Sequence, residues 1–75
     1  MKEFDRVILL TDLPTDGLIR GDVGTIVHCY EDGAAFEVEF FTLSGRTIAV
    51  ATVEAADLRP VSDHDVSHTR ELHSA

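Results

Sequence analysis

Histidine and acidic side chains gather in the last part of the chain, residues 62–75, and their types suit a metal ion. They are Asp63, His64, Asp65, His68, Glu71 and His73. On a helix, His64 and His68 would share one face at i and i+4, a spacing that zinc can use. The two-histidine motif of zinc enzymes carries a glutamate directly after the first histidine, whereas this chain has Asp65 there. The segment also lacks an apolar face, so we expect a disordered polar tail and no metal or cofactor.

A second candidate for chemistry is the glycine-rich stretch LIRGDVGTIVHCYEDG. A Walker-type phosphate loop needs Gly-x-x-x-x-Gly-Lys-Ser/Thr, and a dinucleotide site needs Gly-x-Gly-x-x-Gly. The spacing of Gly17, Gly21 and Gly24 matches neither motif, no lysine follows, and Asp22 would repel an anion. We therefore expect Gly21 and Gly24 to be structural, allowing a tight turn and then a strongly curved strand in which a Cβ would clash.

Glu37, Glu39 and Cys29 could in principle take part in catalysis. A pair of carboxylates does acid–base work only in a pocket that drives their two pKa values apart, and the strand face of Glu37 and Glu39 should be open to water. Cys29 is the only cysteine, and the acidic residues after it disfavour a reactive thiolate. No serine or threonine is paired with a histidine and an acid in a recognisable pattern. We expect no catalytic residue, and we expect Cys29 to be a small core side chain.

The segments that would position these residues are typical of five short strands. Apolar and β-branched residues mark strands within 4–13 and over 23–30, 35–42, 47–53 and 58–61. Asp32-Gly33 and the segment around Gly45 are typical of hairpin turns. Residues 13–22 should form a long loop without regular structure, and residues 54–57 a single 3₁₀ turn. The sequence thus predicts an all-β, five-stranded small barrel over residues 1–61, closed so that no edges are exposed, and a tail over 62–75.

Alternation along these strands predicts which side chains face the core. The clearest pattern puts Phe36, Val38 and Phe40 inside and Glu37 and Glu39 outside. The other expected inward residues are Val27 and Cys29 in one neighbouring strand, Ile48 and Val50 in the other, and either Leu18 or Ile19 at one end of the core.

Three large side chains, Ile26, Tyr30 and Phe41, are then available for an exposed patch. If its strand stays regular, Phe41 points outward beside Glu37 and Glu39; if a bulge interrupts the strand, Phe41 turns inward to fill a barrel end. The outward alternative gives an apolar patch rimmed by acids, a composition suited to capture of a basic protein or peptide. The predicted partner-binding residues are Ile26, Tyr30, Glu37, Glu39 and Phe41.

The charge of the chain narrows the choice of partner. Fourteen acidic residues against six basic ones give a net charge of −8, and the part before Val61 alone carries −6. Such a surface repels nucleic-acid phosphates and favours encounter with a basic partner, although solubility alone would also explain it. The chain has no apolar run of the ~18 residues needed to span a bilayer, and its first residues, MKEFDRVILL, are not typical of a signal peptide. We therefore expect a cytoplasmic protein.

The stretch RGDVGTIVHCYEDG resembles the glycine-containing segment that opens a strand in KOW-type and nitrile-hydratase-β-like barrels. Over residues 4–61, the pattern that begins DRVILLTDLP and ends EAADLRPV is more closely similar to a family of small bacterial proteins known only as a domain of unknown function. This resemblance implies an SH3-like barrel without catalytic residues. An association of the family with toxin-like genes implies an antitoxin or immunity role.

The leading expectation is a non-enzymatic, acidic binding module that engages a protein partner, as an antitoxin or immunity protein does for a basic toxin. Two alternatives stay open: a KOW-like nucleic-acid or ribosome-associated module, and an accessory subunit of an enzyme.

Overall fold

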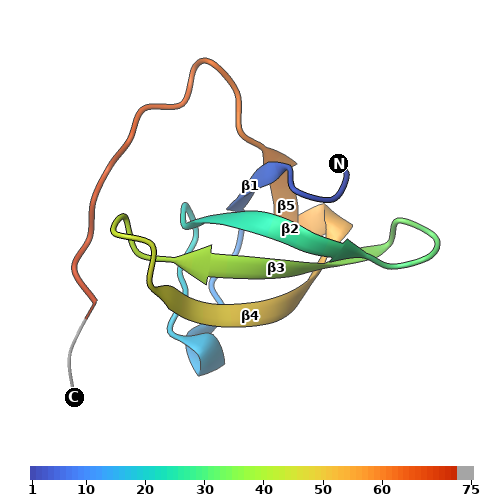
Figure 1. The fold of residues 1–75 in the computed structure, drawn as a ribbon, viewed down its shortest axis with the longest axis horizontal. Helices are drawn as coiled ribbons and strands as arrows, with labels where there is room; N and C mark the ends of the chain where they lie inside the picture. Colours follow the sequence, from blue (N-terminus) through green and yellow to red (C-terminus); the bar gives the residue numbers. More distant parts are fainter. Residues whose placement is uncertain (73–75) are drawn as a thin grey trace.

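The computed structural model describes residues 1–72. Its elements are β1 (Arg6–Leu9), η1 (Pro14–Asp16), β2 (Val23–Cys29), β3 (Ala35–Phe41), β4 (Thr47–Glu54), η2 (Ala55–Asp57) and β5 (Leu58–Pro60), where η denotes a 3₁₀ turn. The strands form one antiparallel sheet in the order β4-β3-β2-β1-β5 (Figure 1). The all-β class, the five strands and the 3₁₀ turn before the last strand are confirmed.

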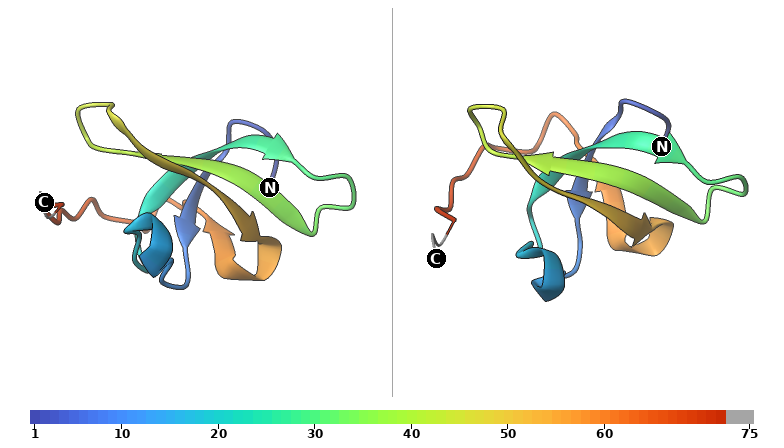
Figure 2. Two further views of the ribbon diagram at one scale, coloured as in Figure 1. Left: turned by 90° about the horizontal axis from the view of Figure 1, so that it is seen from below. Right: turned by 60° about the horizontal axis from the view of Figure 1, so that its bottom comes forward.

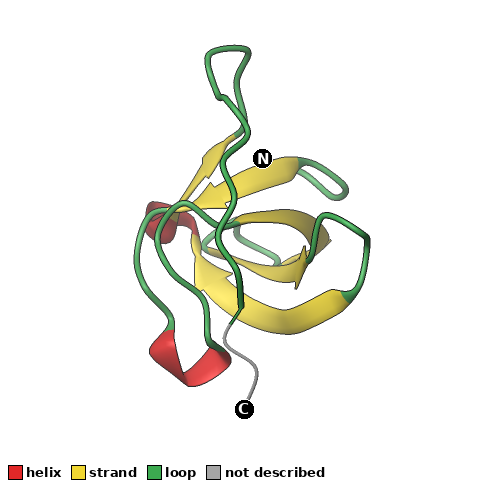
Figure 3. Ribbon diagram, turned by 90° about the vertical axis from the view of Figure 1, so that its left-hand side faces the viewer, coloured by secondary structure: helices red, strands yellow, loops and turns green. Residues whose placement is uncertain are grey.

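The sheet curls around a single core to which every strand contributes. β1 and β5 cross the long ribbon formed by β2, β3 and β4 (Figure 2), and the view in Figure 3 shows the strands arranged around a common interior. The largest fully buried side chains are Phe40, Leu9, Leu18, Ile26, Val7 and Val38. Within residues 1–72, β4 and β5 remain the two ends of the sheet, so hydrogen bonding does not close the predicted cylinder. Pro60 lies on the end strand β5, where its missing N–H costs no ladder bond.

The first strand and the first loop differ from the prediction in detail. β1 begins at Arg6 because Phe4 has a φ of 72°, in the left-handed region, which interrupts an extended chain. The loop predicted to lack regular structure contains the 3₁₀ turn η1, which ends at Gly17 with a φ of 71°. This turn folds the loop back so that Leu13 and Leu18 form an isolated β-bridge. Leu18 is fully buried and closes one end of the core, whereas Ile19 is 44% exposed.

The four glycines predicted to be structural behave as expected. Gly21, Gly33 and Gly45 lie in turns with φ values of 96°, 72° and 96°. Gly24 is needed for a different reason: a Cβ there would lie 2.5 Å from Val38 Cγ1 and 2.9 Å from the Glu39 carbonyl oxygen. The backbone of β2 therefore passes closely over the inward face of β3, which only glycine permits.

Two bulges decide which side chains face inward, and they correct the predictions for Ile26, Val27 and Val50. Val27 was expected to face inward, but it is not among the residues that form the core or pack on it. In β2, Val27 is an extra residue. Ile26 pairs with Val38 and His28 pairs with Glu37, so two steps along β2 correspond to one step along β3. Both Ile26 and Cys29 consequently face the core, although strict alternation cannot put both inside. The prediction that Ile26 lies in an exposed patch is therefore wrong, since its side chain is 0% exposed.

In β4, the extra residue is Ile48, because Phe40 pairs with Ala49 and Phe41 with Thr47. Ile48 packs on the core, as predicted, but the bulge changes the alternation after it. Ala51 and Val53 are the buried residues of β4, and Val50 is 54% exposed. The prediction that Val50 faces inward is therefore wrong.

The part of the tail that the structure describes, residues 62–72, contains no helix or strand. Two arginines connect it to the barrel: Arg59 bonds Asp65 at its start, and Arg70 bonds Asp22 near its end. Within residues 1–72, no helix has the length and apolar character needed to cross a membrane.

Candidate functional site

The outer face of β2, β3 and β4 gathers most of the predicted partner-binding residues. Because antiparallel pairing puts opposite residues on the same face, Glu37 projects beside His28 of β2 and Thr52 of β4. Glu39 likewise projects beside Thr25 and Val50. The residues that carry its charge and its apolar surface are Tyr30, Glu37, Glu39, Phe41 and Val50, and we call them the acidic–aromatic face.

Hydrogen bonds hold the two carboxylates of this face in place. Glu37 accepts a bond from the Tyr30 hydroxyl at 2.9 Å and a second from the Thr52 hydroxyl. Glu39 accepts a bond from the Thr47 hydroxyl at 2.6 Å. These donors come from β4 and from the end of β2, so the acids of β3 are tied to both neighbouring strands. The face therefore presents negative charge at defined positions.

Tyr30 is the exposed aromatic residue at one end of this face. Its ring is 40% exposed and lies edge-on to the His28 ring, with ring centres 4.9 Å apart. The hydrogen bond to Glu37 raises the pKa of the Tyr30 hydroxyl, because the bond favours the protonated phenol and the carboxylate charge opposes ionisation. Tyr30 is thus a neutral hydrogen-bonded aromatic at physiological pH.

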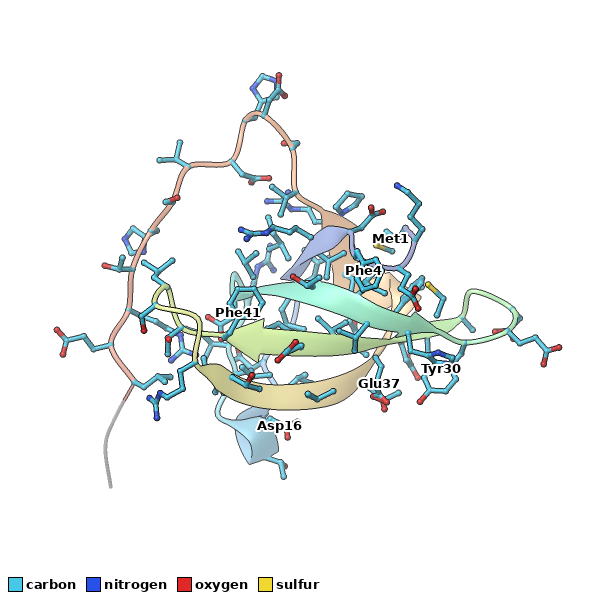
Figure 4. All side chains as sticks on the ribbon, in the orientation of Figure 1. Met1, Phe4, Asp16, Tyr30, Glu37 and Phe41 are labelled. Atoms are coloured by element: carbon cyan, nitrogen blue, oxygen red, sulfur yellow. The ribbon has the colours of Figure 1, made fainter. Side chains whose placement is uncertain are left out.

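Phe41 lies at the other end of β3, away from Tyr30 and Glu37 (Figure 4). The strand keeps its alternation through Phe41, because the bulge falls on β4 at Ile48. Phe41 accordingly takes the outward alternative, on the side of Glu37 and Glu39, but it is only half-exposed. The Arg6 guanidinium lies 6.0 Å from the centre of its ring and covers part of it. Tyr30 and Phe41 therefore do not form the single contiguous patch that was predicted.

Val50 is the residue of this face that the sequence did not identify. Its segment, TIAVATV, is apolar at nearly every position, so the pattern by itself gives no preferred face. The signal lies in the neighbouring strand: the pairing of Val50 with the outward Glu39 makes it an outward residue.

The histidine and acidic residues of the tail were considered above as candidate metal ligands. Within the part of the chain that the structure describes, no three His, Cys, Asp or Glu residues are grouped so that they could hold a metal ion. His64 lies 3.8 Å from Asp63, but Asp65 is bonded to Arg59 at 2.7 Å and to the Ser62 amide at 2.7 Å. These bonds hold the pKa of the Asp65 carboxyl far below its usual range. His73 lies outside the described residues.

The structure places the three catalytic candidates, Cys29, Glu37 and Glu39, as follows. Cys29 is half-buried and packs against the core opposite Phe36. Glu37 and Glu39 are half-exposed acceptors of hydrogen bonds from hydroxyl groups. Neither carboxylate lines the cavity described below; each projects from the outer face of β3.

A second feature lies at the end of the barrel closed by Leu18. A cavity of about 470 Å³ opens there between the β1–β2 loop, the turn between β3 and β4, and tail residues 68–72. Its apolar lining includes Phe40, Phe41 and Ile48, and its polar lining includes Asp22 and Arg70. No pattern in the sequence indicates that the two charged residues meet, because they lie 48 positions apart.

Comparison with known proteins gives a family and no characterised relative. No curated protein and no solved structure matches the chain. The kinship with SH3-like, KOW-type and nitrile-hydratase-β-like barrels thus stays a prediction from the residues. A family model described as a domain of unknown function (DUF4926) matches residues 3–60, which include all five strands and both 3₁₀ turns. The chain belongs to the DUF4926 family.

Proposed function

We propose that this chain is a non-catalytic, acidic binding module of SH3-like type that engages a basic protein partner, as an antitoxin or immunity protein engages a toxin. The observation that carries the proposal is the acidic–aromatic face. There the carboxylates of Glu37 and Glu39 are held by hydrogen bonds from Tyr30, Thr52 and Thr47. Carboxylates fixed in this way lose little side-chain freedom on binding, which favours affinity.

The composition of the face supports a protein partner. Tyr30, just after β2, is 40% exposed and bonds Glu37, and Val50 of β4 is 54% exposed and pairs with Glu39. Interfaces combine aromatic and aliphatic anchors with a polar rim, and tyrosine is among the residues that contribute most to binding energy. The acidic–aromatic face has both parts, with Tyr30 and Val50 as the anchors and Glu37 and Glu39 as the polar rim.

The charge supports a basic partner. The chain carries a net charge of −8, and the two acids of this face add to a field that extends over the surface. Such a field steers a basic protein toward the face and raises the association rate, most strongly at low ionic strength. The same field opposes binding of a phosphate backbone.

The experiment is affinity capture from a nuclease-treated host lysate with three forms of the chain: wild type, Glu39→Lys and Asp63→Lys. Asp63 is a matched control, because its side chain is 96% exposed on the tail and the substitution changes the charge equally. We expect a protein captured by wild type and by Asp63→Lys but lost with Glu39→Lys. The same proteins captured by all three forms, or capture that requires intact nucleic acid, would contradict the proposal.

The captured protein is then purified and its affinity is measured against Val50→Ala and Glu39→Lys. We expect each substitution to weaken binding by about 1–2 kcal/mol, that is about fivefold to thirtyfold, as truncation of a central contact does. For Glu39→Lys, the loss should appear partly in the association rate and should shrink as salt is added.

A further inference from the structure

The cavity at the Leu18 end of the barrel is covered by the chain's own tail. The side chain of Arg70 supplies the hydrogen bonds between the tail and the barrel there. Arg70 donates from Nε to Asp22 Oδ1 at 2.9 Å and from its terminal nitrogen to Asp22 Oδ2 at 2.6 Å. The same terminal nitrogen donates to the Gly17 carbonyl oxygen at 3.2 Å. Within residues 1–72, the backbone of residues 66–72 makes no hydrogen bond to the barrel. The hydrogen bonds that join this segment to the barrel therefore all come from the guanidinium group.

The receptor for this guanidinium is organised by the β1–β2 loop itself. Asp22 Oδ2 also accepts the Ile19 amide hydrogen at 2.9 Å, which orients its carboxylate independently of the tail. The Gly17 carbonyl is presented by the chain reversal at the end of η1, where Gly17 is left-handed. A second carboxylate, Asp12, fixes the same loop by accepting the Arg20 amide hydrogen at 2.8 Å. The loop thus holds three acceptor positions in the fork geometry that suits arginine.

The pKa of the Asp22 carboxyl reflects the cation that is bound to it. Partial burial by itself raises the pKa of Asp22, but the bonds from Arg70 and from the Ile19 amide outweigh it and bring the pKa below its usual value. The side chains of Arg70 and Asp22 are 32% and 17% exposed, so the pair is partly shielded from solvent. Apolar surface from Phe40, Phe41 and Ile48 lines the cavity beside this pair.

We infer that the Asp22–Gly17 pocket is a recognition site for an arginine side chain carried on an extended segment of the basic partner, and that the tail occupies it when the partner is absent. The inference rests on the proposed function and locates a second contact for the same partner. The occupant is an arginine-bearing segment because that chemistry already fills the pocket in the free chain. Lysine would fit less well, since its ammonium donates from one nitrogen, whereas the guanidinium donates to the two carboxylate oxygens from two nitrogens held in a fixed fork.

The tail and the partner then compete for one site. β5 ends at Pro60 and the arginine lies ten residues later, so the tether keeps the tail at an effective concentration on the order of millimolar. A free peptide of the same sequence must exceed that concentration to displace the tail. Removal of the tail arginine releases the pocket, and the barrel itself stays intact.

The test uses the full chain and a labelled peptide of residues 66–72, VSHTREL, as the probe. Binding to wild type and to Arg70→Ala is followed by amide chemical shifts in nuclear magnetic resonance spectra. We expect the peptide to bind Arg70→Ala at least about tenfold more tightly than wild type, with shifts at Gly17, Leu18 and Asp22. A peptide with glutamine in place of its arginine should lose at least about tenfold in affinity.

Asp22→Asn in the Arg70→Ala background should abolish binding of the peptide, because asparagine retains an acceptor for the Ile19 amide but loses the charge. Asp63→Asn is the matched control and should bind the peptide normally. Equal binding of the peptide to wild type and Arg70→Ala, or equal binding of the arginine and glutamine peptides, would overturn the inference. The peptide comparison needs no further change in the protein, so a fold defect in Asp22→Asn cannot obscure the result.

The result of the peptide experiment can be distinguished from the result of the partner experiment. If the captured partner depends on Glu39 but binds Asp22→Asn with unchanged affinity, the proposed function stands and the arginine pocket is refuted. If the peptide behaves as expected but no basic protein is captured, the pocket stands and its assignment to a partner fails.

Discussion

Substitution of Gly24 by alanine tests the close approach on which the curled sheet depends. The added methyl group would lie 2.5 Å from Val38 Cγ1, 2.9 Å from the Glu39 carbonyl oxygen and 3.0 Å from Phe40 Cδ1. Carbon atoms in contact normally lie about 3.5–4.0 Å apart. Val38 and Phe40 are 0% and 1% exposed, so neither side chain can rotate into solvent. The carbonyl belongs to β3, whose pairing with β2 would have to shift.

The loss of stability expected for Gly24→Ala follows from these contacts. Overpacking of a core by one carbon typically costs about 1–3 kcal/mol, and three simultaneous close contacts, one with backbone, place Gly24→Ala at about 2–3 kcal/mol. For a domain of this size, that loss lowers the melting temperature by about 10–20 °C. Urea denaturation should show a lower midpoint with an unchanged slope, because the surface exposed on unfolding is the same.

A double-mutant cycle identifies the cause of the loss. Val38→Ala removes the side chain that makes the shortest contact, so the double variant should be at least about 1 kcal/mol more stable than the sum of the two single effects predicts. Gly21→Ala is the control: its Cβ would meet no atom within 4 Å, but its φ is 96°. It should cost about 1–2 kcal/mol through backbone strain alone and show no coupling to Val38→Ala. A loss below about 0.5 kcal/mol for Gly24→Ala, or strict additivity, would refute the reasoning.

Three further predictions concern other parts of the barrel. Leu18→Ala should lower the free energy of unfolding by about 2–5 kcal/mol, because a fully buried leucine leaves a cavity, while Ile19→Ala at the exposed neighbouring position should change it little in the same urea titration. Tyr30 is the only tyrosine, so ultraviolet absorbance should report a pKa above the usual tyrosine value in wild type and a pKa closer to that value in Glu37→Gln, as the hydrogen bond requires; the same pKa in both forms would contradict the bond. The pKa of the Asp22 carboxyl should lie below the usual aspartate value, so that docking of the tail is fully present above the usual value and is lost as the pH falls through the lowered pKa; resonances of the β1–β2 loop that do not change when Asp22 is protonated would contradict this.

The sequence by itself determined the strands and turns with good accuracy, because these depend on local patterns. The alternation of Phe36, Val38 and Phe40 with two glutamates gives one buried face whatever the neighbours do. The glycine turns need a positive φ that few other residues adopt, so Gly33 and Gly45 marked the hairpins. The short 3₁₀ turn before the last strand was also visible, since EAAD has no strand character.

The tertiary structure alone decided the outward residues of the neighbouring strands. A bulge adds one residue to one strand and changes the alternation after it, and neither Val27 nor Ile48 differs in type from an ordinary strand residue. Ile26 therefore lies inside and Val50 outside, against the prediction. The meeting of Asp22 and Arg70 was equally beyond the sequence, because it depends on where a polar tail crosses the folded barrel. Local chemistry determined which elements form, and the three-dimensional path of the chain determined which side chains meet.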